Sequence, residues 1–574
     1  MNFNEKASMN RDKDGLQINT GLMRQNSVLY DVNVEFTPNF FSEFEAAGFD
    51  YNFLRLSENF GILRLTSETY KQGVIDILRL RSVIDIEKTV RMAPLSNINQ
   101  GVTDGVNATE DIGANYFKNN PNLSITGQGV IIAVADSGID YLHQDFIYPD
   151  GTSKILYLWD QTKEGNPPEN FYIGSEYTRE DLNRAIAEND DSLSQDEQGR
   201  GTMISGICAG LGNINPGYAG VAIDAELIVV KLATLGDNYN NAMLFAASQY
   251  AYLRASQLGR PLVLNISYGS NNLLGITNVD TSRYFERGFC EVVGAGDEGD
   301  TQTHTSGRVQ FAGDFIEVEL ELSEDEEDLT LDLWVERPDQ LDVEIFSPSG
   351  EKSRNSGTFS NYIEVSGIFD LENTVYEMTY IYPTTLSGQQ YTQIYLGSPK
   401  RGIWKIRLTG FSILNGTFNL YLPNRMFLKP GTRFRSPDPS YTINYPGLRA
   451  EVITVGAYNS FNRSLWNGSS RGPTIQNLLK PDIIAPGVNI IAPFPGNTYA
   501  TITGTGAAAA HVSGAAAIYF QYTLVEANYL NQAFFTNFKT FIQLGAEQNT
   551  NTVYPNNSYG YGVLDFRRTF ELFR

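Results

Sequence analysis

A stretch of small residues near the C-terminal end of the chain is its most constraining feature. From Ile502 to Ala517 the sequence reads ITGTGAAAAHVSGAAA, so most of its side chains are no larger than a hydroxymethyl group. Gly504 and Gly506 give the backbone the freedom that a tight turn needs. The alanines that follow favour a helix, and one with so little side-chain bulk can be enclosed on all sides. The stretch therefore predicts a buried central helix entered through a turn.

The composition is that of a large, acidic, folded protein. Its 574 residues are enough for two to four domains. The formal net charge of −24 argues against partners such as nucleic acid or an anionic membrane surface. Cys208 and Cys290 lie in apolar runs and are interpreted as buried thiols, with a bridge or a reactive site as the alternatives. We find no N-terminal signal pattern and no apolar run long enough to span a bilayer.

Apolar runs predict an α/β body. Residues 129–135 form a nearly continuous apolar strand of the kind found in buried parallel sheets. Asp136 follows at its carboxyl end, where α/β proteins place their sites. Similar runs cover residues 227–230, 262–266 and 292–293. We therefore expect a parallel sheet flanked by helices.

These segments, in this order, resemble the subtilisin-like serine proteases. The nucleophile segment of that family usually reads Gly-Thr-Ser-Met-Ala-Ala-Pro-His-Val-Ala-Gly, and residues 504–514 follow it with Gly506 at the serine position. Asp136 opens an Asp-Ser-Gly that matches the aspartate segment. Further matching segments lie at Gly220–Ala222, Ile453–Ala457, Ser469–Pro473, Lys480–Gly487 and Gly560–Asp565. The resemblance covers most of residues 110–300 and 445–570 and implies the subtilisin fold.

Measured against that family, the catalytic positions are degenerate. Asp136 is retained, but Arg200 replaces the histidine within Gly-Arg-Gly-Thr, and Gly506 replaces the serine. Arginine stays protonated and cannot act as a general base, and glycine has no nucleophile. Asp297 replaces the asparagine that donates to the oxyanion, and an ionised carboxylate there would repel developing negative charge. We expect no intact catalytic site.

The three histidines neither restore a base nor form a metal cluster. His143 and His511 stand where the family has non-catalytic histidines, and His304 lies in a polar stretch outside the body. We expect no metal and no cofactor. The acidic run 324–328 is interpreted as a solvated turn, with calcium binding as the alternative.

The segment before the body has the pattern of a small α+β domain. Residues 27–95 predict the order β-α-β-β-α-β of a ferredoxin-like fold, with helices at 40–47 and 67–80. In front of a subtilisin-like body this resembles the prodomain of the family. Residues 1–26 are polar and are interpreted as a tail or linker.

The end of the prodomain, roughly residues 91–100, is expected to lie in the substrate cleft. Its predicted partner is the strand end Ser267, Tyr268 and Gly269, to which it would add as an extended strand. Since this chain has no intact catalytic site, the prodomain should stay attached and cover the cleft.

Between the two halves of the body, residues 301–434 alternate apolar and polar side chains in short runs separated by turns. This pattern predicts a β-sandwich insert. The predicted domains are thus a tail (1–26), a prodomain (27–95), a subtilisin-like domain (96–300 and 435–574) and a jelly-roll insert (301–434).

Prodomain, body and inserted jelly roll together resemble the clostridial germination-specific Csp subtilases, and the polar tail resembles the CspA type more than the CspC type. The resemblance implies a pseudoprotease that regulates bacterial spore germination in the cortex or coat region. Its implied partners are related Csp proteins, a cortex-hydrolase precursor and small germinants. The alternative is a residual or unusual serine-type peptidase that processes the cortex-hydrolase precursor.

The role of Arg200 has two hypotheses. A guanidinium can form directional, charge-assisted hydrogen bonds with carboxylates. Arg200 would then pair with Asp136, and also with Asp297, as a structural clamp. The alternative is a drifted side chain that points to solvent.

Overall fold

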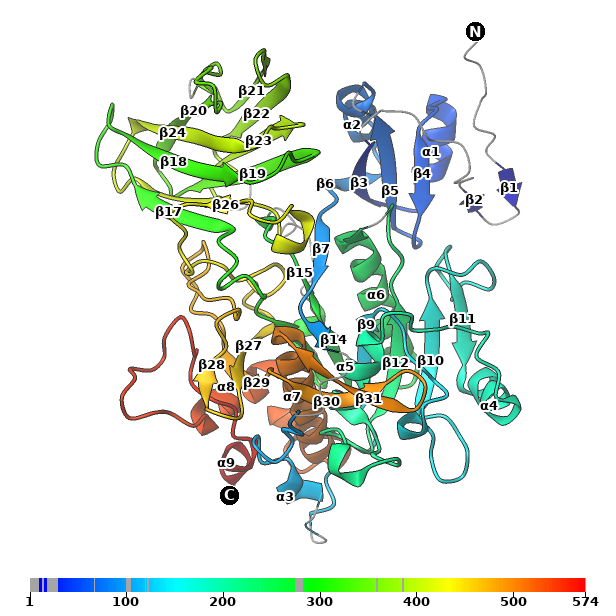
Figure 1. Cartoon of the computed structure of the whole chain (residues 1–574). Coiled ribbons are helices and arrows are strands. Elements are labelled where there is room, and N and C mark those ends of the chain that lie inside the picture. The colour runs from blue at the N-terminus through cyan, green and yellow to red at the C-terminus, as the bar shows by residue number, and fades with distance from the viewer. Residues whose placement is uncertain are drawn as a thin grey trace.

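The structure is a computed structural model of the whole chain (Figure 1). It describes residues 29–66, 68–99, 105–118, 120, 123–236, 238–273, 282–357, 360–384 and 387–572, together with two short strands before them. Those strands, β1 (Asn10–Asp12) and β2 (Gly15–Gln17), pair antiparallel. The rest of the tail predicted at 1–26 lies outside the described residues.

The N-terminal α+β part is a four-stranded antiparallel sheet with two helices. The strands lie in the order β4 (Asn52–Arg55), β5 (Phe60–Thr66), β3 (Leu29–Phe36) and β6 (Val83–Lys88). Helices α1 (Phe40–Ala47) and α2 (Tyr70–Leu78) share one apolar core with β3 and β5. The predicted β-α-β-β-α-β order is confirmed. The second helix begins at Tyr70, with Thr69 as its N-cap, and not at the predicted residue 67.

A nine-stranded, mostly parallel sheet forms the centre of the body. Its parallel strands are β10 (Ile155–Asp160), β12 (Glu226–Lys231), β9 (Ile131–Asp136), β14 (Leu262–Ile266), β16 (Phe289–Gly294), β27 (Ile453–Asn459) and β29 (Ile483–Pro486). Strands β11 (Ser175–Thr178) and β28 (Ser464–Leu465) join it antiparallel. Every residue of β9 and β16 is buried. The predicted α/β fold class is therefore confirmed.

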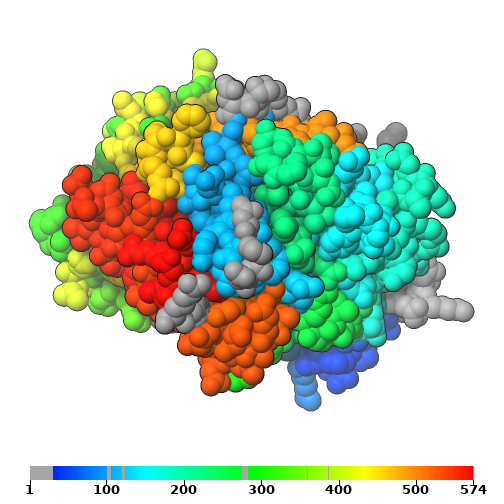
Figure 2. All heavy atoms as spheres, turned by 90° about the horizontal axis from the view of Figure 1, so that it is seen from below, coloured from blue at the N-terminus to red at the C-terminus, as the bar shows by residue number. Residues whose placement is uncertain are grey.

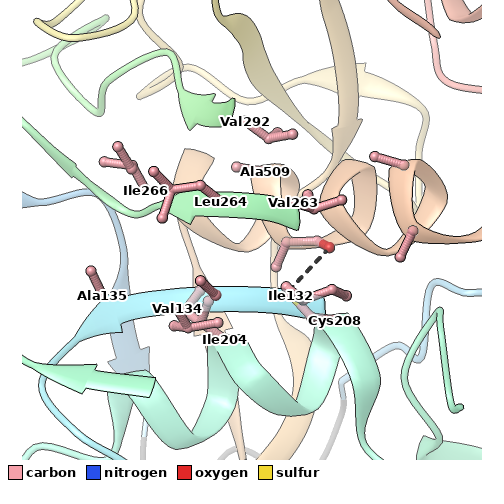
Figure 3. Close-up of a cluster of buried hydrophobic side chains, with 14 of the residues drawn as sticks. Ile132, Val134, Ala135, Ile204, Cys208, Val263, Leu264, Ile266, Val292 and Ala509 are labelled. Atoms are coloured by element: carbon pink, nitrogen blue, oxygen red, sulfur yellow. Dashed lines mark hydrogen bonds between the residues drawn. The ribbon is translucent and has the colours of Figure 1, made fainter. Parts of the chain in front are cut away.

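Helix α7 (Thr505–Phe520) is buried over its whole length, as the small-residue stretch predicts. Figure 3 shows Ala509 of this helix near the β14 side chains, and Cys208 of helix α5 (Arg200–Ala209) near Ile132 of β9. Cys208 Sγ donates to the carbonyl of Ala510 at 3.5 Å. Cys208 and Cys290 are both free and buried. Small side chains let the two helices and the sheet approach closely.

The insert is a sandwich of two antiparallel sheets around one apolar core. The six-stranded sheet consists of β17 (His304–Arg308), β25 (Thr417–Tyr421), β19 (Asp328–Val335), β23 (Gln390–Gly397), β22 (Thr374–Ile381) and β21 (Tyr362–Phe369). The four-stranded sheet consists of β20 (Gln340–Phe346), β24 (Gly402–Ser412), β18 (Phe315–Leu322) and β26 (Arg433–Phe434). The predicted all-β insert is confirmed.

The acidic run at 324–328 is only partly the solvated turn that we expected. Glu326 is buried and accepts hydrogen bonds from the backbone N–H of Lys429 and from Thr432 Oγ1. Asp325 pairs with Lys400, and Asp328 opens strand β19. The described residues contain no group of three histidine, cysteine or acidic side chains that could hold a metal ion.

After the prodomain the chain crosses the underside of the body. Figure 2 shows this segment, around helix α3 (Asn115–Lys118), next to the C-terminal segment drawn in red. The ring of Phe117 lies 5.0 Å from that of Phe566 and 4.9 Å from that of Phe570, in helix α9 (Phe566–Glu571). The described residues also form the α-helices α4 (Arg179–Glu188), α6 (Asn241–Gln257) and α8 (Phe535–Gly545). Within the described part of the chain, no helix has the length and apolar character needed to cross a membrane.

Candidate functional site

Arg200 and Asp136 form a buried ion pair at the carboxyl end of the sheet. Asp136 is the last residue of β9, and Arg200 is the first residue of α5. Arg200 Nε donates to Asp136 Oδ1 at 2.8 Å, and the side chains are 3% and 0% exposed. At this burial neither charge could lie here without the other. The side chain of Arg200 therefore does not point to solvent.

The guanidinium also contacts the ring of Tyr268, which packs against a second tyrosine, Tyr239. The Arg200 guanidinium carbon lies 4.2 Å from the centre of the Tyr268 ring, which contacts the Tyr239 ring at 4.8 Å. Burial acts to lower the pKa of Arg200, but Asp136 and Tyr268 raise it by more. The arginine thus stays charged and has no tendency to accept a proton.

Hydrogen bonds fix the start of α5 against the end of β9. Ser137 Oγ donates to Asp196 Oδ1 and accepts from the backbone N–H of Gly201. Asp196 Oδ2 accepts from both the N–H and the hydroxyl of Thr202. This network holds the backbone at position 200 at a set distance from Asp136.

Asp297 lies next to the start of α7. Its Oδ1 accepts from the N–H of Thr505 at 2.9 Å and from Thr505 Oγ1 at 2.8 Å. Among the described residues, the carboxylate that pairs with Arg200 is Asp136. The part of the clamp hypothesis that joined Arg200 to Asp297 is therefore wrong, because Thr505 takes the place of the guanidinium.

The electrostatic surroundings of Asp297 favour its neutral form. Burial raises its pKa to about 7, and Glu298 and Asp300 add to the rise, while the bonds from Thr505 act in the opposite direction. Part of the residue remains accessible, but the Oδ2 atom is buried.

The prodomain tail runs through the cleft as two short strands. Strand β7 (Arg91–Pro94) lies between β15 (Tyr268–Gly269) and β13 (Tyr239–Asn240) and pairs antiparallel with both. In Figure 1 it descends from the α+β part into the body. Further on, β8 (Asn97–Asn99) pairs with β31 (Thr498–Thr503), whose other neighbour is β30 (Ile490–Phe494). The predicted partner residues Ser267, Tyr268 and Gly269 thus line the first half of the tail.

Leu95 stands between these two strands and faces the degenerate site. Its N–H donates to the carbonyl of Ser267 at 2.9 Å, and its own carbonyl accepts from the N–H of Gly506 at 2.7 Å. The side chain is buried, and its methyl carbons lie beside Gly269 and Gly294. The Leu95 carbonyl thus lies against position 506, which aligns with the nucleophile position of the subtilisin-like proteases.

The glycines at 504 and 506 make this close approach possible. A Cβ at Gly506 would lie 2.9 Å from the carbonyl oxygen of Leu95 and 3.0 Å from Ser96 Oγ. At Gly504, where φ is +152°, a Cβ would lie 2.4 Å from both Leu95 O and Ser96 Cα. Any other residue at either position would therefore displace the tail or distort the turn.

The histidines lie away from the reacting positions. Ring nitrogens of His143 contact the backbone of Asp145 and Thr498. His304 lies in the insert between Asn419 and the Asp438 carbonyl. His511 bonds within its own helix to the Ala507 carbonyl, and burial lowers its pKa to about 4. The arrangement around Leu95 can bind an extended peptide. Among the described residues, position 200 holds an arginine and position 506 a glycine, so these two positions supply neither a base nor a nucleophile.

Sequence reasoning missed the second wall of the cleft and the residue at its centre. The sequence does not predict strands β13 and β31. Tyr239–Asn240 is too short to show the alternation of apolar and polar residues that marks a strand, and the end of Thr498–Thr503 resembles a turn. Leu95 carried one available signal, since it is the apolar residue midway along the expected tail.

Comparisons with known proteins agree with this geometry. The family model described as Peptidase_S8, subtilase family, matches residues 127–319 and 424–562. Subtilisin BL from Lederbergia lenta is 40% identical over 77 residues, which are 13% of this chain and 26% of that protein. Serine protease AprX from Bacillus subtilis is 39% identical over 105 residues, or 15% of this chain and 24% of AprX. The chain thus spans about a quarter of the length of these curated relatives.

One solved structure resembles nearly the whole architecture. The CspB protease of Clostridium perfringens superposes with a TM-score of 0.73 and 27% sequence identity. The match covers 81% of this chain and 98% of the CspB chain.

Proposed function

This chain belongs to the subtilase family, and we propose that it is a catalytically inactive member that regulates bacterial spore germination by binding other proteins. The observation that carries the proposal is the contact between Leu95 and Gly506. The carbonyl of Leu95 is bound as a substrate carbonyl would be, yet position 506 offers it only a backbone N–H.

The position of Arg200 supports the same proposal. A protease of this type needs a neutral base between the aspartate and the nucleophile. Here a charged guanidinium fills that place and is held by Asp136. In subtilisin itself, loss of the serine or the histidine alone lowers turnover by about 10⁶-fold. Both are replaced in this chain.

The proposed germination role rests on the structural similarity of this chain to the CspB protease of Clostridium perfringens. We extend it to this chain with the partners that the Csp resemblance implies, namely related Csp proteins, a cortex-hydrolase precursor and small germinants. The spore cortex or coat is the corresponding location, and no cofactor is required. Placement with the CspA type is part of the proposal and depends on the polar residues 1–26.

The occupied cleft limits where such partners bind. Because β7 and β8 already pair with strands of the body on either side of Leu95, a partner peptide cannot add there without displacing the tail. A tethered tail also has a high effective concentration. Partners therefore bind on other surfaces, such as the jelly roll or a seam between domains.

Incubation of the purified protein with cortex-hydrolase precursors and peptide substrates tests the absence of catalysis. We expect no turnover from the parent chain, and none from the Arg200→Ala and Asp297→Ala variants at a temperature where each is folded. Turnover that disappears in either variant would instead establish the alternative, a residual peptidase.

The regulatory role is tested by binding. The full chain is used to capture proteins from native spore extract with and without germinants, followed by titration with purified Csp proteins and precursor. We expect saturable binding to at least one of them. A chain that binds none of these proteins and no germinant would contradict the regulatory role while leaving the lack of catalysis intact.

A further inference from the structure

Asp297 has one carboxylate oxygen whose bonds are complete and one whose bonds are not. Thr505 supplies two hydrogen bonds to Oδ1, through its N–H and its hydroxyl. In the described part of the chain, Oδ2 is buried without a hydrogen-bond partner. Leaving a buried carboxylate oxygen unpaired is costly, so this atom calls for an explanation.

The Oδ2 atom of Asp297 and the carbonyl oxygen of Leu95 both lie beside Gly504. Both oxygens converge on the same side of Gly504, where a Cβ would lie 2.4 Å from Leu95 O and 2.6 Å from Asp297 Oδ2. Leu95 O accepts one hydrogen bond, from Gly506 N–H, and a carbonyl oxygen has a second lone pair. An ionised Oδ2 would set two acceptors against each other in a buried space, whereas a protonated one would be a donor to that lone pair.

We propose that Asp297 is protonated when the tail is docked, and that its Oδ2–H donates to the carbonyl oxygen of Leu95. The uncut tail is then held by two donors, Gly506 N–H and the Asp297 carboxyl group. This makes Asp297 a positioning residue for the tail, and the inference does not depend on the germination role.

The surrounding charges are consistent with a neutral carboxyl group. Within its own loop the neighbours are the acids Glu298 and Asp300, and both raise the pKa of Asp297. The start of α7 contributes Thr505, which is uncharged. The tail residues Leu95 to Asn99 are Leu-Ser-Asn-Ile-Asn, none of them titratable. Asp136 and Arg200 pair with each other.

Asp297 should therefore bind a proton more readily when the tail is docked than when it is undocked, at pH values between its two pKa values. With the tail undocked, water reaches Asp297 and its pKa falls towards the usual value of 3.8. With the tail docked, the pKa is about 7. Docking is favoured most below the lower value, weakens as the pH rises between the two, and levels off above pH 7. The tail is thus released more easily in neutral than in acidic solution.

Hydrogen exchange of the intact full-length protein measures this release. Exchange of peptides that span residues 91–99 is followed from pH 5.5 to pH 8 and corrected for the intrinsic rate. We expect the opening equilibrium of the wild-type tail to rise at least about tenfold. The Asp297→Asn variant keeps a donor at every pH and should show a flat profile. Asp300→Asn removes one of the two acids that raise the pKa of Asp297, so it should keep the pH dependence but shift it to lower pH.

The protonated carboxyl group can also be observed directly by infrared spectroscopy. This measurement does not depend on how stable a variant is during hydrogen exchange. The infrared difference spectrum between wild type and Asp297→Asn at pH 6 should contain the carbonyl band of a neutral carboxylic acid, which disappears by pH 9. A wild-type tail whose opening does not depend on pH, or a spectrum without that band at pH 6, would overturn the proposal.

Discussion

The backbone N–H of Gly506 donates a hydrogen bond of 2.7 Å to the carbonyl oxygen of Leu95. In an acyl-transfer site such a donor stabilises the charge that develops on the attacked carbonyl. Here the donor remains, but the same residue lacks the side chain that would attack. The bond therefore serves to hold the tail.

Restoring the catalytic groups should restore self-cleavage only when the oxyanion donor is restored as well. At pH 8, where Asp297 is ionised, we expect little cleavage from Arg200→His with Gly506→Ser. Adding Asp297→Asn should accelerate cleavage between Leu95 and Ser96 by about 100-fold or more, the usual worth of one oxyanion donor. Intact mass and gel electrophoresis over time measure the fragments.

The matched control for that series carries alanine in place of serine at position 506. Its Cβ meets the same crowding by Leu95 O and Ser96 Oγ, but it has no nucleophile. Cleavage in this control would indicate a contaminating protease. Efficient processing by the double variant at pH 8 would show that Asp297 does not obstruct the chemistry.

Removing the guanidinium from the buried pair should destabilise the protein. Arg200→Ala leaves Asp136 as an unpaired buried charge, for which a loss of about 3–5 kcal/mol in the free energy of unfolding is typical. Denaturant unfolding measures the loss. Arg184, whose pair with Asp181 lies on the surface, serves as the control, and Arg184→Ala should have little effect. Equal stability of the two variants would argue that the buried pair contributes nothing.

Shortening the side chain at the centre of the tail should loosen it. Leu95 is 1% exposed, and Leu95→Ala removes apolar atoms packed beside Gly269 and Gly294. A buried leucine truncated in this way typically costs about 2–5 kcal/mol. We expect added protease to cut between residues 91 and 99 much faster than in wild type. Leu78→Ala, at a 58% exposed position of α2, should leave the cutting rate unchanged.

Of the two lysines that join the prodomain to the insert, Lys88 and Lys71, the less exposed Lys88 should contribute more to stability. Lys88 Nζ donates to Gln393 Oε1 at 3.0 Å. Burial lowers the pKa of Lys88, while Asp332 and Glu377 act in the opposite direction. Lys88→Met should lower the free energy of unfolding by about 1–3 kcal/mol, because Asp332 loses its nearby cation. Lys71→Met, which removes an exposed partner of Glu364, should be nearly neutral, and a reversed order of the two effects would contradict this assignment.

Local features of the sequence were enough to predict much of the fold. The small residues of 505–520 predict a buried helix from the local sequence alone, because helix propensity and side-chain size depend only on the residues of that segment. The same holds for the alternation that predicts β3, β5 and β6, and for the apolar run of β9. The prediction for the second helix of the prodomain begins too early, since the hydroxyls of Thr66 and Thr69 each accept a hydrogen bond from the other residue's backbone N–H in the turn before Tyr70. Of the acidic run, Glu326 was misjudged because its partners, Lys429 and Thr432, are distant in sequence.

At the candidate site, the residue types were evident from the sequence, but their contacts were not. Arginine at 200 and glycine at 506 exclude a base and a nucleophile whatever surrounds them, because those limits belong to the side chains. Whether Arg200 meets Asp136 or solvent, and whether Asp297 meets Arg200 or Thr505, depends on how α5, α7 and the loop after β16 pack. Such contacts join residues far apart in the chain, and only tertiary packing sets their distances. The position of Leu95 over Gly506 was decided in the same way.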